Sequence, residues 1–443
     1  MENNILIKNG IIITLGEKNK VLYNHNLVIS EGKIKSITEN VPTDTKFDKV
    51  IDADGKLVMP GFINSHMHFY STLVRGLGKA EPAHTFQEVL ENLWWRLDKK
   101  LSLEDTYYSA LVMLIQSIKF GTTTLIDHHA SPGVIKGSLM EIARAVKETG
   151  LRASLCYELS DRDGEQKSQE GIEENEDFIK YCNSENSEYL KAMFGLHASF
   201  TIEDATLQKA SEIGNKYNSG FHVHVAEALS DQTTTREKFG NSVVERFNDF
   251  KILGKKTIAA HCIHIDGGEM DLLSDTGTMV AHNPQSNMNN AVGIADIIML
   301  QEKGILVGLG TDAMTVNMLE EVRAAMWAQH LHNEDPAVGF MEIVNTLFFN
   351  NAKIANRFWG NKIGVLEEGA AADVILLDYF SPTPLNDNTV LGHFIFGLSN
   401  AKVDTTIVNG KVLMENQKLL IDLDEAEVNA KAREITAKLW DRF

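Results

Sequence analysis

The chain has 443 residues, which is long enough for a large hydrophobic core and for more than one domain. Hydrophobic residues make up 43% and charged residues 23%, as in ordinary soluble globular proteins, and no apolar run reaches the length of a membrane span. The formal net charge of −19 disfavours nucleic acid as a partner, because phosphate binding needs a basic surface.

Residues 1–58 predict short strands joined by tight turns. Asn9-Gly10 lies between two apolar runs in the segment Ile5–Ile13, and this is the strongest short signal for a hairpin. Glu31-Gly32 and Asp54-Gly55 predict two further turns. So few strands do not form a stable core alone, so we expect them to pair with strands from elsewhere in the chain.

Residues 59–364 alternate strand-like apolar runs with amphipathic helical stretches. The eight runs are Leu57–His68, Thr122–His129, Leu151–Leu159, Lys191–Ser199, Gly220–Glu227, Lys256–Cys262, Thr278–Asn283 and Ile305–Asp312. Strict alternation of strand and helix is typical of a parallel sheet. Eight repeats predict an α/β fold with a (β/α)8 TIM-like barrel. A doubly wound sheet is the competing interpretation, but it usually has fewer strands, and no Gly-x-Gly-x-x-Gly motif follows an early strand.

The C-terminal part supplies the missing strands. Residues 369–378 predict a strand, and Asn409-Gly410 predicts a hairpin. We therefore predict a small β-sandwich domain formed from both chain ends, residues 1–58 with 365–418. Residues 419–443 contain a stretch rich in Ala, Glu and Lys, which predicts an exposed C-terminal helix.

Polar and ionisable residues stand where several of the eight runs end. His66 and His68 end the first run, and residues two apart on a strand point to the same side, as two ligands of one metal ion must. Other runs end in or carry His197, His222, His224, Glu227, His261 and Asp312. Because the C-terminal ends of barrel strands converge, this pattern predicts a metal-dependent active site.

The residues alone leave alternatives open for each position. His222 and His224 share one face of a strand, so the strand pattern does not decide which of them binds metal, and the other one packs or forms a hydrogen bond. His261 also fits a hydrogen-bonded histidine at a strand end, and Asp312 fits a helix N-cap. Glu227 also fits a solvated carboxylate.

Three cysteines, Cys156, Cys182 and Cys262, are few and widely spaced, which is typical of reduced thiols. The first residues, Met1–Asn4, lack the basic and apolar regions of a secretory signal. We therefore expect a cytoplasmic protein that acts on a small molecule, with no nucleic acid or membrane as partner.

Several motifs together resemble the metal-dependent amidohydrolase superfamily. They are Pro60-Gly61-Phe62-Ile63-Asn64-Ser65-His66-Met67-His68, His224-Val225-Ala226-Glu227, His261 and Gly310-Thr311-Asp312. The resemblance is greatest to the branch that contains adenosine-type deaminases, guanine deaminases and triazine chlorohydrolases, and within it to the SsnA-type aminohydrolases. It covers the barrel and both chain ends, and it is much less specific for a substrate than for the superfamily.

The resemblance implies one zinc ion, or another divalent metal, bound by His66, His68, His224 and Asp312. It also implies that Glu227 is the proton shuttle, that His261 and Asp312 assist in activating water, and that His197 contacts the substrate. The stretch Met193–His197 lacks the lysine that bridges two metals in dinuclear relatives, and this favours a single metal.

The implied function is that of a metal-dependent aminohydrolase, or deaminase. Such an enzyme uses activated water to release ammonia from a carbon of a heterocyclic or amidine-like small molecule. Two alternatives remain: hydrolysis of another leaving group, such as chloride, at the same kind of carbon, and a metal-binding relative without activity. The resemblance also suggests a homodimer, and it does not identify the substrate.

Overall fold

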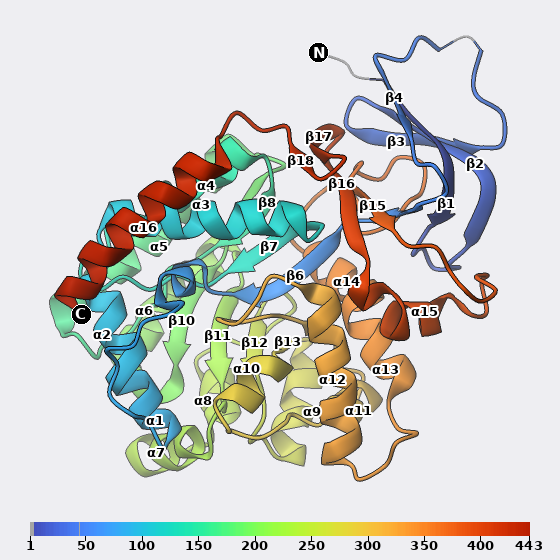
Figure 1. The fold of residues 1–443 in the computed structure, drawn as a ribbon. Helices are drawn as coiled ribbons and strands as arrows, with labels where there is room; N and C mark the ends of the chain where they lie inside the picture. The colour runs from blue at the N-terminus through green and yellow to red at the C-terminus, as the bar shows by residue number, and fades with distance from the viewer. Residues whose placement is uncertain (1–3, 44) are drawn as a thin grey trace.

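The computed structural model describes residues 4–43 and 45–443. Residues 1–3, on which part of the expected absence of a secretory signal rests, lie outside the described residues. Figure 1 shows two parts, an α/β barrel and a β-rich part that contains strands from both ends of the chain.

Parallel strands in two hydrogen-bonded sheets surround the centre of the larger part, as the sequence predicts for a (β/α)8 barrel. One sheet has the order β6-β7-β8-β9 and the other β10-β11-β12-β13-β14. Bridges from Met67 to Asp312 and from Leu159 to Leu196 connect the edges of the two sheets. The strands are β6 (Phe62–Met67), β7 (Thr122–Asp127), β8 (Arg152–Leu155), β9 (Leu190–Ala192), β10 (Phe194–Ala198), β11 (Phe221–Val225), β12 (Ile258–His261), β13 (Met279–His282) and β14 (Val307–Leu309).

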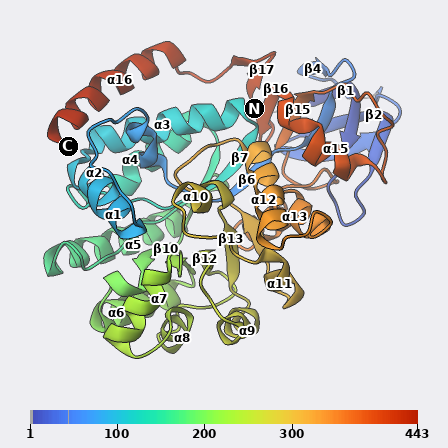
Figure 2. The same cartoon turned by 60° about the horizontal axis from the view of Figure 1, so that its bottom comes forward.

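Helices surround these strands, as Figure 2 shows from below. They include α3 (Leu103–Lys119), α4 (Ser138–Thr149), α5 (Glu165–Glu185), α6 (Asp204–Tyr217), α7 (Leu229–Phe239), α8 (Val243–Asp249), α9 (Gly267–Thr276), α10 (Pro284–Asn289), α11 (Ile297–Glu302), α12 (Met318–His332), α13 (Phe340–Asn345) and α14 (Asn351–Ala355). Among the described residues, no helix combines the length and the apolar character that a membrane crossing requires.

The barrel strands separate two sets of side chains by their period of two. On β13, Val280 packs in the main core with side chains of the helices, whereas Met279 and Ala281 pack with Ile258 in a small cluster between the strands. The same alternation puts Val223 of β11 in the main core. His222 and His224 therefore share the opposite face of β11, toward the centre of the barrel.

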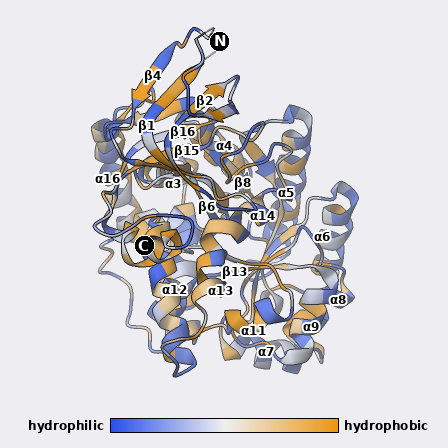
Figure 3. Cartoon of the chain, turned by 90° about the vertical axis from the view of Figure 1, so that its right-hand side faces the viewer, coloured by the Kyte–Doolittle hydropathy of each residue, from blue (hydrophilic) through white to orange (hydrophobic). Residues whose placement is uncertain are grey.

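Strands from both chain ends form one sheet of nine strands. Its order is β18-β17-β16-β15-β5-β1-β2-β3, with β4 also paired to β1, and Figure 3 draws these strands mostly in hydrophobic colours. A bridge between Lys33 and Ala371 ties β3 back to the segment before β15. The strands are β1 (Ile5–Ile13), β2 (Val21–Ser30), β3 (Lys33–Thr38), β4 (Lys49–Asp52), β5 (Leu57–Pro60), β15 (Val374–Asp378), β16 (Lys402–Val408), β17 (Lys411–Glu415) and β18 (Lys418–Leu419). The exact domain boundaries, 1–58 with 365–418 and 59–364, stay a prediction.

The hairpin predicted at Asn9-Gly10 is wrong. β1 continues through these residues, and its pairing with β2 shifts register on either side of Gly10. Asn9 adopts a left-handed conformation with φ of 59°, so the dipeptide makes a bulge instead of a turn. The bulge lets the first half of β1 pair with β4 and the second half with β5. The hairpins expected at Glu31-Gly32 and Asn409-Gly410 are present.

The apolar run Leu57–His68 divides at Gly61 between the two parts of the structure. β5 belongs to the nine-stranded sheet, and β6 belongs to the barrel. A Cβ atom at Gly61 would lie 2.2 Å from Thr123 Cγ2, so only glycine allows this close crossing. The segment that carries His66 and His68 is therefore anchored in both parts.

The C-terminal helix α16 (Glu425–Arg442) is less exposed than the sequence predicts. It lies beside α3 in Figures 1 and 2. Its buried face includes Ile435 and Leu439, and Trp440 Nε1 donates a hydrogen bond of 2.8 Å to the backbone oxygen of Leu73. This buried face is hard to recognise from the composition of the helix, because the face consists of only a few apolar residues.

One buried ion pair joins the barrel to the nine-stranded sheet. Arg152 on β8 is fully buried, and its Nε and Nη2 atoms lie 2.8 Å and 3.3 Å from the two carboxylate oxygens of Asp373. We expect Asp373→Ala to lower the free energy of unfolding by about 3–5 kcal/mol, because it removes the buried carboxylate that pairs with Arg152 and leaves this charge mainly with the neutral oxygens of Glu188 and Asn409.

Urea unfolding measures this effect, with Asp387→Ala as the control. The exposed pair between Asp387 and Lys20 should contribute far less to the free energy of unfolding, because water screens both charges. Equal losses in both variants would contradict a special role for the buried pair.

Candidate metal centre and active site

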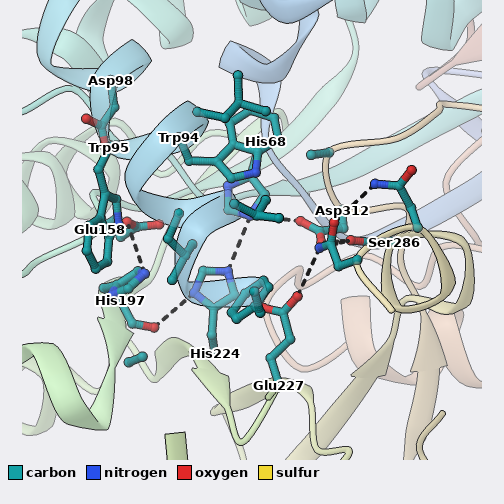
Figure 4. A pocket seen from close by; sticks show the side chains of 18 of the residues that line it. His68, Trp94, Trp95, Asp98, Glu158, His197, His224, Glu227, Ser286 and Asp312 are labelled. Atoms are coloured by element: carbon teal, nitrogen blue, oxygen red, sulfur yellow. Dashed lines mark hydrogen bonds and ion pairs between the residues drawn. The ribbon is translucent and has the colours of Figure 1, made fainter. Parts of the chain in front are cut away.

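The four predicted metal ligands meet at the C-terminal end of the barrel. Asp312 Oδ1 lies 3.0 Å from Nε2 of His68 and 3.5 Å from Nε2 of His66. Nε2 of His224 lies 3.3 Å from Nε2 of His68. His66 belongs to β6 and His224 to β11, whereas His68 and Asp312 follow β6 and β14, so different strands supply the group. Figure 4 shows His68, His224 and Asp312 around one point.

The other ring nitrogen of each histidine has a partner that fixes the ring. Nδ1 of His68 donates to the backbone oxygen of His128 at 2.5 Å, and Nδ1 of His224 donates to that of His197 at 2.9 Å. Nδ1 of His66 lies 2.8 Å from Nε2 of His222. Such outer partners set which nitrogen stays available to a metal. His222, whose role the strand pattern left open, thus contacts His66, one of the predicted ligands.

The donor set fits a cation. Because carbonyl oxygens only accept hydrogen bonds, Nδ1 carries the hydrogen in His68 and in His224. The two Nε2 atoms then face each other with their lone pairs, which repel unless a metal ion or a proton lies between them. Nε2 of His66 and of His261 are buried without a hydrogen-bond partner among the described residues. Imidazole nitrogens with one carboxylate are ligands that zinc accepts readily.

Electrostatics of the metal-free chain point the same way. Burial lowers the pKa of His66 to about 3 and holds the pKa of His224 well below its usual value, so both rings are neutral as ligands must be. Burial alone would also lower the pKa of His68, but the hydrogen bond and charge of Asp312 raise it to about 9. A proton on His68 therefore balances the buried Asp312 charge in the absence of a cation.

Glu227 reaches this centre through a sharp turn at the end of β11. Ala226 has φ of 45°, a left-handed conformation that turns the chain off the strand. The amide of Glu227 donates to Asp231 Oδ2 at 3.0 Å, and Asn290 Nδ2 donates to Glu227 Oε1 at 3.3 Å. Burial and the charges of neighbouring carboxylates raise the pKa of Glu227 well above its usual value.

His261 completes the centre at the end of β12. Its Nε2 atom lies 3.5 Å from Glu227 Oε2 and 3.9 Å from Asp312 Oδ2. Nδ1 of His261 donates to Asn287 Oδ1 at 2.8 Å, and Ser286 donates to Asp312 Oδ2 at 2.5 Å. His261 is thus a hydrogen-bonded histidine at a strand end, as one alternative expected, whereas the N-cap of the following helix α12 is Asn317 and not Asp312.

The pocket above the centre is covered by a helical segment, residues 86–100. It consists of α1 (Phe86–Val89), a π-helical turn (Leu90–Trp94), α2 (Trp95–Leu97) and a 3-10 turn (Asp98–Lys100). Trp94 and Trp95 line the pocket together with His197, which was predicted from sequence. The His197 ring lies 6.1 Å from that of Trp95 and 5.7 Å from that of His224.

Sequence reasoning missed three acidic residues of this pocket, Asp98, Glu158 and Asp231, and Glu158 is the one that its position in the chain could have identified. It follows β8, at the end of a predicted run, and its carboxylate lies 3.2 Å from His128 Nδ1. The signal was the same strand-end position that identified the other site residues. Asp98 was missed because its place depends on the covering segment.

We expect purified protein to hold about one divalent metal ion per chain, since the groups of possible ligands around the centre share residues and so make one site. His224→Ala should lose most of this metal, measured by elemental analysis after gel filtration. His264→Asn is the control, because His264 Nε2 instead contacts the backbone oxygen of Val292 at 2.7 Å. Equal metal content in both variants would contradict the site.

Comparisons with known proteins agree with this geometry. The model of the amidohydrolase family matches residues 57–413. A 5'-deoxyadenosine deaminase of Methanosarcina acetivorans is 34% identical over 99% of both chains. A 5-methylthioadenosine/S-adenosylhomocysteine deaminase of Acetivibrio thermocellus is 33% identical over 98% of this chain and 99% of its own.

Among solved structures, an adenosine deaminase from Xanthomonas campestris with bound zinc superimposes with a TM-score of 0.86 at 20% identity. The alignment covers 99% of this chain and 98% of that one, so the likeness in fold includes the barrel and the β-rich part. The expected family and fold are thereby confirmed, as is the expected class of enzyme, a metal-dependent hydrolase of non-peptide carbon–nitrogen bonds. The chain belongs to the amidohydrolase family.

Proposed function

We propose that the chain is a zinc-dependent deaminase that removes the exocyclic amino group of an adenosine-like heterocycle. The observation that carries the proposal is the convergence of three histidines and Asp312 beside the buried carboxyl group of Glu227. The names of the two similar deaminases support the adenosine-like substrate. An aromatic wall of Trp94 and Trp95 suits a flat ring.

In this proposal His66, His68, His224 and Asp312 hold the zinc ion. When bound, zinc acts as a Lewis acid that lowers the pKa of water to about 7. The side chains named above keep their lone pairs directed at one point without rearrangement, because their outer partners already fix them.

The proton path uses the residues around that point. Asp312 Oδ2 and His261 Nε2 lie 3.9 Å apart and accept the proton of the attacking water. Glu227 gives a proton to the ring nitrogen beside the reacting carbon and later helps ammonia to leave. His197 borders the substrate from the side of the covering segment.

The proposal also includes a cytoplasmic location and a homodimer. The three cysteines are buried and unpaired, which suits a reducing compartment. The homodimer rests on the resemblance to the superfamily alone, and sedimentation of the purified protein tests it.

The reaction class is tested by what is released. We expect a panel of purine nucleosides, purines, pyrimidines and pterins to include at least one compound from which the zinc-loaded protein releases stoichiometric ammonium. Release of halide from chlorinated analogues, without ammonium from any amine, would instead support the alternative leaving group. The measurement is an enzyme-coupled ammonium assay beside ion chromatography.

Glu227→Gln should separate catalysis from metal binding. Glutamine keeps the size of the side chain but cannot carry a proton between water and substrate. We therefore expect turnover to fall by about two to four orders of magnitude while zinc content stays at the parent level. Full turnover in this variant would remove Glu227 from the proton path, and loss of zinc would make it a ligand.

A further inference from the structure

Glu158 is a buried pocket residue that the proposed reaction does not use. It is 6% exposed and lines the same pocket as the metal centre. Oε2 lies 3.2 Å from His128 Nδ1, whereas Oε1 lies 3.9 Å from His197 Nε2, beyond hydrogen-bond distance. Among the described residues, no hydrogen-bond donor reaches Oε1. One carboxylate oxygen of this buried residue therefore lies at the pocket without a donor from the described protein residues, and it can accept a hydrogen bond from a ligand.

The other carboxylates of the pocket are already engaged. The lining includes Asp98, Glu158, Glu227, Asp231 and Asp312. Asp98 pairs with Arg162, and Asp231 accepts from the backbone amides of Glu227 and Ala228. Asp312 faces the histidines of the metal centre. Asp98 Oδ1 and Asp231 Oδ1 are also buried without a hydrogen-bond partner, but among the described residues neither belongs to the groups of side chains around the metal centre, whereas Glu158 lies within 4.8 Å of His68, His128 and His224 there.

The pocket also has a one-sided charge. In the described part of the chain, its lining contains these acidic residues and neither lysine nor arginine. A substrate with a phosphate or carboxylate would find no lysine or arginine to bind it away from the metal centre, and it would face several acidic side chains. Figure 4 shows Glu158 and His197 on one side of His224 and Glu227 on the other, so two carboxyl groups border a bound ring from opposite sides.

We propose that Glu158 determines specificity by accepting a hydrogen bond from an N–H group of the substrate, on the side opposite Glu227. The acidic lining restricts the substrate to neutral or positively charged amino-heterocycles and their nucleosides, and excludes nucleotides. The inference rests on the proposed function for the identity of the site, and it names the class of compound that the site takes.

Binding and turnover are measured separately, so that the two proposals fail in different ways. Calorimetry with the zinc-loaded protein measures affinity for adenosine, 5'-deoxyadenosine, guanine and cytosine, and for adenosine 5'-monophosphate. The ammonium assay measures turnover of the same compounds. Absence of ammonium with retained binding would contradict the deaminase proposal only.

We expect the best neutral compound to bind about tenfold or more tightly than the monophosphate. Glu158→Gln should weaken its binding about 10- to 100-fold, the scale of a lost hydrogen bond to a charged group, with unchanged zinc content. Glu158→Asp, which keeps the charge on a shorter side chain, should lose less. In Glu158→Gln the loss should appear in KM more than in kcat, because Glu227 and the zinc ligands are intact.

The matched control is Glu174→Gln, which changes an equally buried carboxylate outside the pocket. Glu174 accepts hydrogen bonds from the amides of Gly137 and Leu139, so its replacement should leave zinc content and affinity for every probe unchanged. Tighter binding of the monophosphate than of all neutral compounds would overturn the proposal. So would unchanged affinities in Glu158→Gln, or failure of every neutral compound to bind.

Discussion

The metal centre of this protein depends on buried imidazole rings in which one nitrogen has a hydrogen-bond partner and the other is left for a metal ion or a proton. A buried nitrogen without a partner raises the free energy of the folded state. Each ring is therefore stable in its position only when one nitrogen forms a hydrogen bond and the other binds a cation or a proton. Here the backbone oxygens of His128 and His197, which end neighbouring strands, supply the second partner for His68 and His224. The strands that carry the ligands thus also orient them, and the spacing of the sheet sets the spacing of the site.

The strand ends carry strain at the same places. Ala226, His261 and Asp312 have φ of 45°, 73° and 52°, a region that costs non-glycine residues about 1–2 kcal/mol each. Backbone hydrogen bonds hold the turns, including those from the amide of Asp312 to the oxygen of His66 and from Cys262 to Val225. Each turn redirects a side chain from along the strand to the pocket above it.

Much of the fold follows from patterns that act locally. Alternation of apolar runs and amphipathic stretches predicted the barrel, because the periods of strand and helix differ. The strand-end position predicted His66 and His68, whereas the choice of His224 over His222 needed a resemblance, since both side chains point inward. The hairpin prediction at Asn9-Gly10 was wrong because the left-handed conformation occurs both in tight turns and in bulges. The pairing of β1 with β4 and β5, which are not adjacent to it in the chain, selects the bulge.

Asp98, Trp94 and Trp95 could not be placed from sequence for a different reason. They lie on the covering segment, whose helical turns begin with Thr85 as N-cap, and its position over the pocket depends on long-range packing. One contact of this kind is the pair between Asp98 and Arg162, far apart in the chain. Such contacts leave no periodic signal.

The division of the run Leu57–His68 between two parts of the structure has a consequence for synthesis on the ribosome. β5 emerges early and pairs with β1, but its other neighbour, β15, comes from near the end of the chain. Until then one edge of β5 stays unpaired, and an open edge invites association with other chains. A nascent chain of this protein therefore needs protection for most of its translation, and its metal ligands sit only a few residues from the exposed edge.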